Sequence, residues 1–364
     1  MKRARFLMIG GFLGAGKTTT IARLARHYTD QGLSVGLVTN DQAYNLVDTE
    51  SLRAQGFNVG EVPGACFCCK FDDLVQTAKE LSEETAPDLI ITEPVGSCTD
   101  LVATVIEPMR HLYGDQYEIA PLAVILKPEH GMKILRDEQV GFSPKAAYIF
   151  LKQIEEADIV AVNKVDKLSD DQRAELINLV SQRFPDKRVL AMSARDGEGV
   201  AELIDQLSAA SERHETFMEV DYEVYAEGEA ELGWLNCQAT FTGETFSLDK
   251  VLVALVQQLR DGLADENSET AHLKVLGQAN NESAIANLVG GGADVELSLE
   301  SGVKTSECEL IVNARVAIDP EVLEQIVTDS VSSIANRFDL GHSIAGVQRF
   351  RPSPPVPTHR MTAP

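Results

Sequence analysis

The sequence predicts an α/β fold with a parallel sheet in its first 211 residues, followed by a smaller α+β domain. Short apolar runs alternate with amphipathic helical patterns up to Ser211, and a glycine-rich turn follows the first apolar run. Beyond that residue the composition becomes acidic and the order of expected elements changes. Alternation of strand and helix is typical of a parallel sheet with helices on both faces.

Six apolar runs are expected to form the strands of this sheet, because a strand buried on both faces has an almost continuous apolar sequence. Helical patterns are expected after Lys17, after the cysteine-rich segment 66–69 and from Leu101 onward. The expected strands are 6–9, 35–39, 89–92, 122–126, 159–162 and 189–191. We therefore assign residues 1–211 to the first domain.

An acidic linker is predicted at 212–232, because glutamates gather there and no Lys or Arg occurs between His214 and Asp249. Residues 233–345 are expected to form an α+β domain with a ferredoxin-like arrangement. Its expected strands are 234–241, 272–276, 295–299 and 310–317, and its expected helices are 248–263 and 320–337. The Pro-rich tail 346–364 is expected to be extended or disordered.

Charge and composition exclude several classes of protein. The formal net charge of −24 over 364 residues disfavours binding to nucleic acid or to anionic membranes. No apolar run reaches the length of a membrane span, and the first residues lead into a strand rather than a signal peptide. Six cysteines, three of them bunched, do not resemble a secreted disulfide framework. A cytoplasmic protein is expected.

The segment Gly11–Thr18 matches the phosphate-binding loop consensus, with a strand before it and a helix after it. Its glycines let backbone N–H groups approach phosphates, and the helix N-terminus adds a favourable dipole. Lys17 is expected to bridge the terminal phosphates and the Thr18 hydroxyl to ligate Mg²⁺. A chance glycine-rich turn is the alternative. The expected nucleotide-contacting residues here are Gly14, Ala15, Gly16, Lys17, Thr18 and Thr19.

A guanine-reading segment is predicted at Asn163-Lys164-Val165-Asp166, at the end of an expected strand. The Asp166 carboxylate can accept two hydrogen bonds from guanine that adenine cannot donate, so GTP and GDP are the expected nucleotides. An ordinary turn is the alternative. Downstream, Ser193, Ala194 and Arg195 look like the loop that backs guanine in GTPases.

Glu93 and Gly96 follow another expected strand. A carboxylate at this edge would hold Mg²⁺ directly or through water, and the Gly96 N–H could meet the γ-phosphate. A glutamate that merely caps the next helix is the alternative.

Three cysteines, Cys66, Cys68 and Cys69, fall within four residues and predict a transition-metal site. Thiolates favour ions such as Zn²⁺, Co²⁺ and Ni²⁺. Cysteines buried as small apolar groups and a redox sensor are the alternatives. Cys98, two residues after Gly96, is close enough in sequence to approach the site, although packing is the commoner role for such a residue.

In combination, these motifs resemble the metal-handling GTPases of the SIMIBI class, and the cysteine motif resembles the CobW-like branch in particular. The resemblance covers about the first 210 residues. It implies a SIMIBI-type P-loop GTPase fold, Mg²⁺-dependent GTP hydrolysis and a metallochaperone role. Lys17, Glu93 and Gly96 would act in hydrolysis.

The chain departs from the family pattern at several points. The family's Asn-Glu-Phe-Gly is replaced by Asn40-Asp41-Gln42-Ala43, where Asp41 could keep the acidic role toward the transition metal. Asp48 could match the switch aspartate that approaches Mg²⁺ and takes part in hydrolysis. Ala65 separates Gly64 from the first cysteine, and no histidine-rich stretch is present. The second half does not clearly match the CobW C-terminal domain.

The expected function is GTP-hydrolysing delivery of a transition metal from Cys66, Cys68 and Cys69 to a client metalloprotein or a cofactor-biosynthesis enzyme. No Gln or Arg is evident that would position the attacking water, so slow turnover is expected. Two alternatives stay open: a GTPase chaperone that gates a corrinoid or another cofactor, and a redox-responsive regulatory GTPase. A homodimer and the identity of the metal and client are also open.

Overall fold

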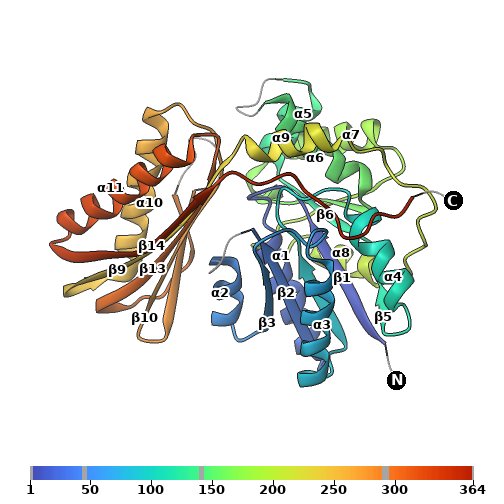
Figure 1. Ribbon diagram of the computed structural model, residues 1–364, viewed down its shortest axis with the longest axis horizontal. Coiled ribbons are helices and arrows are strands. Elements are labelled where there is room, and N and C mark those ends of the chain that lie inside the picture. The colour runs from blue at the N-terminus through green and yellow to red at the C-terminus, as the bar shows by residue number, and fades with distance from the viewer. Residues whose placement is uncertain (1–2, 43–46, 139–142, 289–294, 363–364) are drawn as a thin grey trace. The chain divides into compact units, whose positions relative to one another are not determined.

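The computed structural model describes residues 3–42, 47–138, 143–288 and 295–362. The chain divides into two compact units (Figure 1). Unit 1 contains residues 1–42, 56–228 and 354–364, and unit 2 contains residues 43–55 and 229–353. None of the helices in the described part of the chain has the length and apolarity needed to span a bilayer.

Unit 1 is built on an eight-stranded sheet in the order β3-β2-β4-β1-β6-β7-β8, with β5 also paired to β1. All of its strand pairs are parallel, as the apolar runs predicted. The strands are β1 (Ala4–Gly10), β2 (Val35–Asp41), β3 (Asn58–Pro63), β4 (Leu89–Glu93), β5 (Tyr117–Ile119), β6 (Ala123–Leu126), β7 (Ile159–Val162) and β8 (Arg188–Ala191).

Helices connect the strands of unit 1 in the α/β manner, which confirms the predicted fold class (Figure 1). They are α1 (Lys17–Asp30), α3 (Phe71–Thr85), a π-helical turn η1 (Val102–Ile106), α4 (Glu107–Tyr113), α5 (Pro128–Leu135), α6 (Pro144–Glu156), a 3₁₀ turn η2 (Val165–Lys167), α7 (Asp170–Arg183), α8 (Val200–Ser208) and α9 (Tyr222–Ala230). Because the strands are parallel, the residues that follow β1, β2, β4, β7 and β8 share one edge of the sheet.

Unit 2 is an antiparallel sheet in the order β12-β11-β10-β13-β9-β14, with two helices. Helix α10 connects β9 to β10 and helix α11 connects β13 to β14, which is the split βαβ arrangement of ferredoxin-like folds with a β11–β12 extension at one edge. The bounds are β9 (Gly233–Ser247), α10 (Leu248–Asp265), β10 (Thr270–Ala279), β11 (Glu282–Leu288), β12 (Val295–Leu299), β13 (Lys304–Val316), α11 (Pro320–Arg337) and β14 (Leu340–Phe350).

The core of unit 2 forms between its two helices and one face of the sheet, where buried side chains such as Leu252 and Val327 pack with Val312. On β13 and β9, the Arg315 guanidinium lies 4.2 Å from the Trp234 ring centroid, and it donates hydrogen bonds to Leu235 O and Asn236 Oδ1. These partners are consistent with a guanidinium that is almost fully buried.

Helix α2 (Val47–Ala54) belongs to unit 2 although it lies early in the sequence. The Val47 N–H donates to Asn313 Oδ1 at 2.9 Å, and Asp48 pairs with Lys274. This long-range placement is not encoded by any local pattern in the sequence.

Two predicted boundaries differ from the structure. Helix α9 occupies the end of the predicted acidic linker, and its Tyr222 hydroxyl donates to the Asp100 carboxylate of unit 1 at 2.7 Å. The predicted tail 346–364 begins inside β14, and its last part returns to unit 1. We call residues 354–361 the C-terminal strap, the red end of the chain in Figure 1.

Candidate functional site

The phosphate loop connects β1 to α1 at the carboxyl edge of the parallel sheet. Gly14 and Gly16 adopt positive φ angles of 72° and 100°, a region that L side chains rarely occupy. Lys17 begins α1 and is buried, and Thr18 is half-buried beside it. The loop therefore presents backbone N–H groups at a helix N-terminus, which suits an anion such as a phosphate.

Asn163 links the phosphate loop to the loop after β8. Its Nδ2 donates to Ala15 O at 2.8 Å, and its Oδ1 accepts a hydrogen bond from the Ala194 N–H at 2.9 Å. The neighbouring Lys164 Nζ donates to Gly14 O at 2.9 Å. The structure thus brings the predicted phosphate loop, Asn163 and Ala194 together.

Asp166 lies in the turn η2 and its side chain is exposed, so the carboxylate is available to a ligand. A capping box of Ser169 and Gln172 starts α7 directly after this turn and fixes where the turn ends. Ser193 is buried and Arg195 is exposed in the following loop.

Glu93 ends β4 directly opposite the phosphate loop. Its Oε1 accepts a hydrogen bond from Thr18 Oγ1 at 3.0 Å and lies 3.9 Å from Lys17 Nζ. Gly96 is in close contact with the same lysine, since a Cβ at Gly96 would lie 2.9 Å from Lys17 Nζ. The hydroxyl of Thr18 and the carboxylate of Glu93 form an oxygen pair of the kind that Mg²⁺ prefers, so these residues fit that ion.

The three clustered cysteines lie in the loop between β3 and α3, and all are free thiols. Among the described residues, Cys66, Cys68 and Cys69 form a set whose ligand atoms all lie within 4.8 Å of one another. The Sγ–Sγ distances are 3.0 Å for Cys66–Cys68, 3.3 Å for Cys66–Cys69 and 3.8 Å for Cys68–Cys69. Cys66 and Cys68 are buried and Cys69 is half-buried.

These distances allow one ion to contact all three sulfurs. A triangle with these sides has a circumscribed radius of about 2.0 Å, shorter than the Zn–S bond of about 2.3 Å. Cys66, Cys68 and Cys69 would therefore hold one thiophilic ion together, with their sulfurs as its ligands. The donor set fits a thiophilic metal with one further position for another ligand.

The three thiols differ in pKa because they hydrogen-bond to one another. Hydrogen bonds with Cys68, Cys69 and Cys98 lower the pKa of Cys66 well below its ordinary value of 9.0. The same hydrogen bonding with Cys66 raises the pKa of Cys68, and it raises the pKa of Cys69 to about 11. Cys66 is therefore the thiol whose pKa the cluster lowers, and Cys68 and Cys69 are the thiols whose pKa it raises.

Asn40, in β2, hydrogen-bonds to the loop that carries the three clustered cysteines. Its Nδ2 donates to Val62 O and to Ala65 O, both at 2.7 Å, and its Oδ1 accepts a hydrogen bond from the Phe67 N–H at 2.8 Å. Sequence reasoning used Asn40 only as part of a motif and missed this role. The available signal was the position of Asn40 next to Asp41, a predicted ligand of the transition metal.

Cys98 contacts the cluster, since its thiol hydrogen-bonds with Cys66. It is buried, and its backbone oxygen accepts a hydrogen bond from Gln153 Nε2 at 2.8 Å. Because Cys98 lies two residues after Gly96, the loop that faces Lys17 also reaches the thiols.

Asp41 and Asp48 lie in different units of the chain. Asp41 ends β2 and is not among the described residues whose ligand atoms cluster with the three sulfurs. Asp48 belongs to unit 2, where it pairs with Lys274. Their roles toward the transition metal and Mg²⁺ stay predictions, and residues 43–46, which separate them in the sequence, lie outside the described residues.

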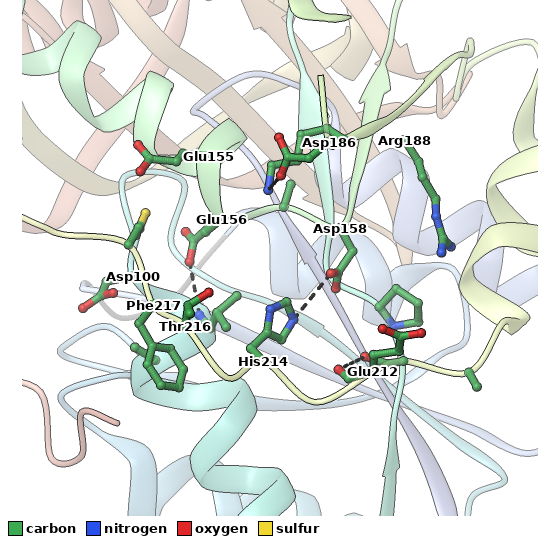
Figure 2. A pocket seen from close by; sticks show the side chains of 18 residues that line it. Asp100, Glu155, Glu156, Asp158, Asp186, Arg188, Glu212, His214, Thr216 and Phe217 are labelled. Atoms are coloured by element: carbon green, nitrogen blue, oxygen red, sulfur yellow. Dashed lines mark hydrogen bonds and ion pairs between the residues drawn. The ribbon is translucent and has the colours of Figure 1, made fainter. Parts of the chain in front are cut away.

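A separate polar pocket of about 500 Å³ lies in unit 1 where strands β7 and β8 begin. Figure 2 shows Glu156, Asp158 and His214 among its lining residues, with His214 directed toward Asp158. Glu156 accepts hydrogen bonds from the Thr99 hydroxyl and the Val102 N–H, and complete burial raises its pKa to about 8. This pocket is at the opposite edge of the sheet from the phosphate loop.

Comparison with known proteins places these features in a family. Residues 5–191, just over half of the chain, match the family described as CobW/HypB/UreG, nucleotide-binding domain. The zinc chaperone YeiR of Escherichia coli (strain K12) is 28% identical over 190 residues, 50% of this chain and 53% of that protein. The zinc chaperone CobW of Sinorhizobium sp is 26% identical over 273 residues, 64% of this chain and 74% of that protein. The matched part thus spans about half the length of the first relative.

One solved structure, the Zn(II)-bound YjiA GTPase from E. coli, is similar over 92% of this chain and 99% of its own. The sequence identity is 11% and the TM-score is 0.37. At that level the likeness carries no functional inference.

Proposed function

Because this chain belongs to the CobW/HypB/UreG family of nucleotide-binding proteins, we propose that it is a GTP-hydrolysing metallochaperone. In this proposal Cys66, Cys68 and Cys69 hold a transition metal, and a client metalloprotein or metallocofactor pathway receives it. The observation that carries the proposal is the set of three sulfurs within 4.8 Å of one another, in the same compact unit as the phosphate loop. The curated relatives named as zinc chaperones make Zn²⁺ the first ion to test.

The nucleotide site is proposed to bind Mg²⁺ and GTP through the residues described above. Lys17 would neutralise the terminal phosphates, and Thr18 with Glu93 would supply oxygens to Mg²⁺, whose chemistry is to stabilise the charge that develops on the phosphate oxygens. Asn163 would hold the phosphate loop and the loop that contains Ala194 in a fixed relative position. The exposed Asp166 would accept hydrogen bonds from the guanine edge, while Ser193, Ala194 and Arg195 would back the base.

Two physical connections support coupling between the nucleotide and the metal. Gly96 packs against Lys17, and Cys98, two residues further on, hydrogen-bonds with Cys66. Asn40 connects the end of β2 to the backbone on both sides of Cys66. A change in the phosphate contacts of either segment would alter the arrangement of the sulfurs, as in other nucleotide switches.

The test is a competition titration of Zn²⁺, Co²⁺ and Ni²⁺ with and without a non-hydrolysable GTP analogue. The proposal predicts that the analogue tightens metal binding by about 5- to 150-fold, the usual range of coupling free energies. Cys68→Ser and Cys69→Ser should lose the site, while Cys237→Ser, a buried cysteine of unit 2, should retain it. Metal affinity that the analogue leaves unchanged, or full stoichiometry in the two site variants, would overturn the proposal.

A redox-responsive GTPase is the second candidate, favoured by the 3.0 Å separation of the Cys66 and Cys68 sulfurs. It predicts that mild oxidation changes GTP turnover without any metal present. Oxidation of the metal-free protein tests this candidate separately from the metal titration. A change in GTP turnover under those conditions would need no bound metal.

A further inference from the structure

The C-terminal strap reaches the thiol site through its backbone. The Val356 N–H donates to Cys69 Sγ at 3.2 Å, and the Thr358 N–H donates to Cys68 O at 2.8 Å. The Thr358 hydroxyl adds a hydrogen bond to Cys69 O at 3.2 Å. Two of the three clustered cysteines are therefore bonded to a segment nearly 290 residues away in the sequence.

The strap has a second set of contacts beyond the thiols. The Met361 N–H donates to Ala103 O at 2.8 Å, and Arg360 Nε donates to Asp100 Oδ2 at 2.7 Å. The His359 ring stands edge-on to the Phe71 ring at the start of α3, with centroids 4.9 Å apart. These contacts hold the part of the strap that follows Thr358.

The way in which the strap is held suits a segment that opens. Val356 anchors through its N–H while its side chain is 75% exposed, and Thr358 and Arg360 are also exposed. Pro355 is buried and Pro357, His359 and Met361 are half-buried, so a few backbone hydrogen bonds, one part-exposed ion pair and a small number of packed side chains hold the strap. A short segment held by so few contacts opens at a small fraction of the global unfolding free energy. The thiols beneath are, by contrast, largely buried.

We propose that the C-terminal strap controls access to the thiol site. It positions Cys69 through the Val356 N–H, and it must open before a metal ion can enter or leave. This inference rests on the proposed metal-binding function, and it adds the step that controls exchange. A hydrogen bond to a ligand sulfur orients that ligand, as outer partners of metal ligands generally do. The strap then acts as a lid whose opening sets the rate of transfer.

The first measurement needs no metal. The rate at which 5,5′-dithiobis(2-nitrobenzoate) modifies Cys69 is followed by mass mapping in the reduced, metal-free protein. A variant that ends at Ser353 should react at least about tenfold faster than the full chain, since a covered group reacts only through its open form. A variant that ends at Met361 keeps every strap contact described here and should react as the full chain does.

A matched pair of substitutions isolates the N–H···S bond. Val356→Pro removes the donor at a position already flanked by proline on both sides, where an extended backbone is favoured. Val356→Ala shortens an exposed side chain and keeps the N–H. The proline variant should accelerate Cys69 modification, and the alanine variant should not. Circular dichroism and binding of a GTP analogue verify that each variant is folded.

The second measurement is the release of Zn²⁺ to 4-(2-pyridylazo)resorcinol. Variants with faster thiol modification should release Zn²⁺ faster by a similar factor. Equal thiol rates in the full chain, the Ser353-terminated variant and Val356→Pro would overturn the strap proposal whatever the metal does. If the full chain binds no Zn²⁺, Co²⁺ or Ni²⁺, the proposed function fails, and the thiol rates still decide whether the strap covers the site.

Discussion

The side-chain nitrogen of Asn163 lies 2.4 Å from the position that a Cβ on Gly16 would occupy. The Asn163 amide, which hydrogen-bonds to Ala15 of the phosphate loop, therefore fills the space that a side chain at residue 16 would need. Two loops that are about 150 residues apart in the sequence constrain each other's residue types at this point.

Gly16→Ala is expected to abolish GTP binding. The substitution combines an unfavourable φ of 100° with a collision with Asn163, so the hydrogen bond from Asn163 to Ala15 is broken. Fluorescent GTP-analogue titration measures the loss. Gly32→Ala is the matched control, because its φ is 82° and no atom lies within 4 Å of the added carbon. It should cost about 1 kcal/mol of stability and leave binding intact. Equal binding in both variants would refute the explanation.

Asp166→Asn is expected to weaken GTP binding by about 10²- to 10⁴-fold. The proposed carboxylate accepts two charge-assisted hydrogen bonds, each contributing about 1.5–3 kcal/mol, and tenfold in affinity is about 1.4 kcal/mol. Competition between GTP, ATP and XTP measures the change, and the preference for GTP over ATP should fall by the same factor. Asp170→Asn, in the first turn of α7, is the control and should behave as the unmodified protein. An unchanged preference would exclude Asp166 as the guanine-reading residue.

Glu93→Gln is expected to lower Mg²⁺-dependent GTP hydrolysis by about 10- to 100-fold, a usual effect of removing a charge that organises a metal site. The amide retains the shape of the side chain that accepts the Thr18 hydrogen bond, so the fold and nucleotide binding should persist. Steady-state phosphate release over a range of Mg²⁺ concentrations distinguishes a raised Mg²⁺ requirement from a lower maximal rate. Glu80→Gln on the exposed face of α3 is the control. Hydrolysis at the normal rate would remove Glu93 from the site.

Glu156 is expected to make the protein less stable as the pH rises from about 5 to above 8. Burial raises its pKa to about 8, whereas the unfolded chain titrates near its ordinary value of 4.5. Between these values the folded state holds a proton that the unfolded state has released. The stabilising contribution of protonated Glu156 is therefore fully present below pH 4.5 and is lost as the pH rises through 8. The free energy of unfolding falls by up to about 1.4 kcal/mol per pH unit in this range.

Urea unfolding at several pH values tests this dependence in the unmodified protein and in Glu156→Gln. The glutamine cannot ionise, so the slope of the unfolding free energy against pH should be flatter in that variant only. Glu155→Gln alters the neighbouring residue, which pairs with Lys152, and should keep the original slope. Parallel slopes in all three proteins would show that Glu156 does not control the pH dependence.

Much of unit 1 could be predicted from local pattern. The apolar runs before Gly10, Glu93 and Asn163 are continuous enough to identify buried strands, and the motif at each strand end follows from where parallel strands place ligands. Strand β3 was missed because Gly60, Glu61 and Pro63 interrupt its apolar pattern. Strand β14 was missed because most of its side chains are exposed. Neither strand has the apolar periodicity that sequence analysis detects.

The cluster of thiols was predictable and its surroundings were not. Spacing alone indicated Cys66, Cys68 and Cys69, because three cysteines in four residues are uncommon without a ligand or redox role. The strap was predicted to be extended or disordered because proline-rich segments rarely pack. Its hydrogen bonds use backbone N–H groups at Val356 and Thr358, which carry no sequence signal. The placement of α2 in unit 2 depends on Asn313 and Lys274, which are too distant in sequence to be inferred from a local pattern.

The position of the strap has a practical consequence for purification. Met361 is bonded to Ala103, and Val356, five residues earlier, is bonded to Cys69. Histidines fused after this segment would emerge within a short length of chain from three thiols, and imidazole nitrogen combines readily with thiolate around zinc. Metal stoichiometries measured on such a fusion would mix the affinity of the tag with that of the protein. An amino-terminal tag, or removal of the tag by protease before titration, avoids a hybrid site that the protein itself does not contain.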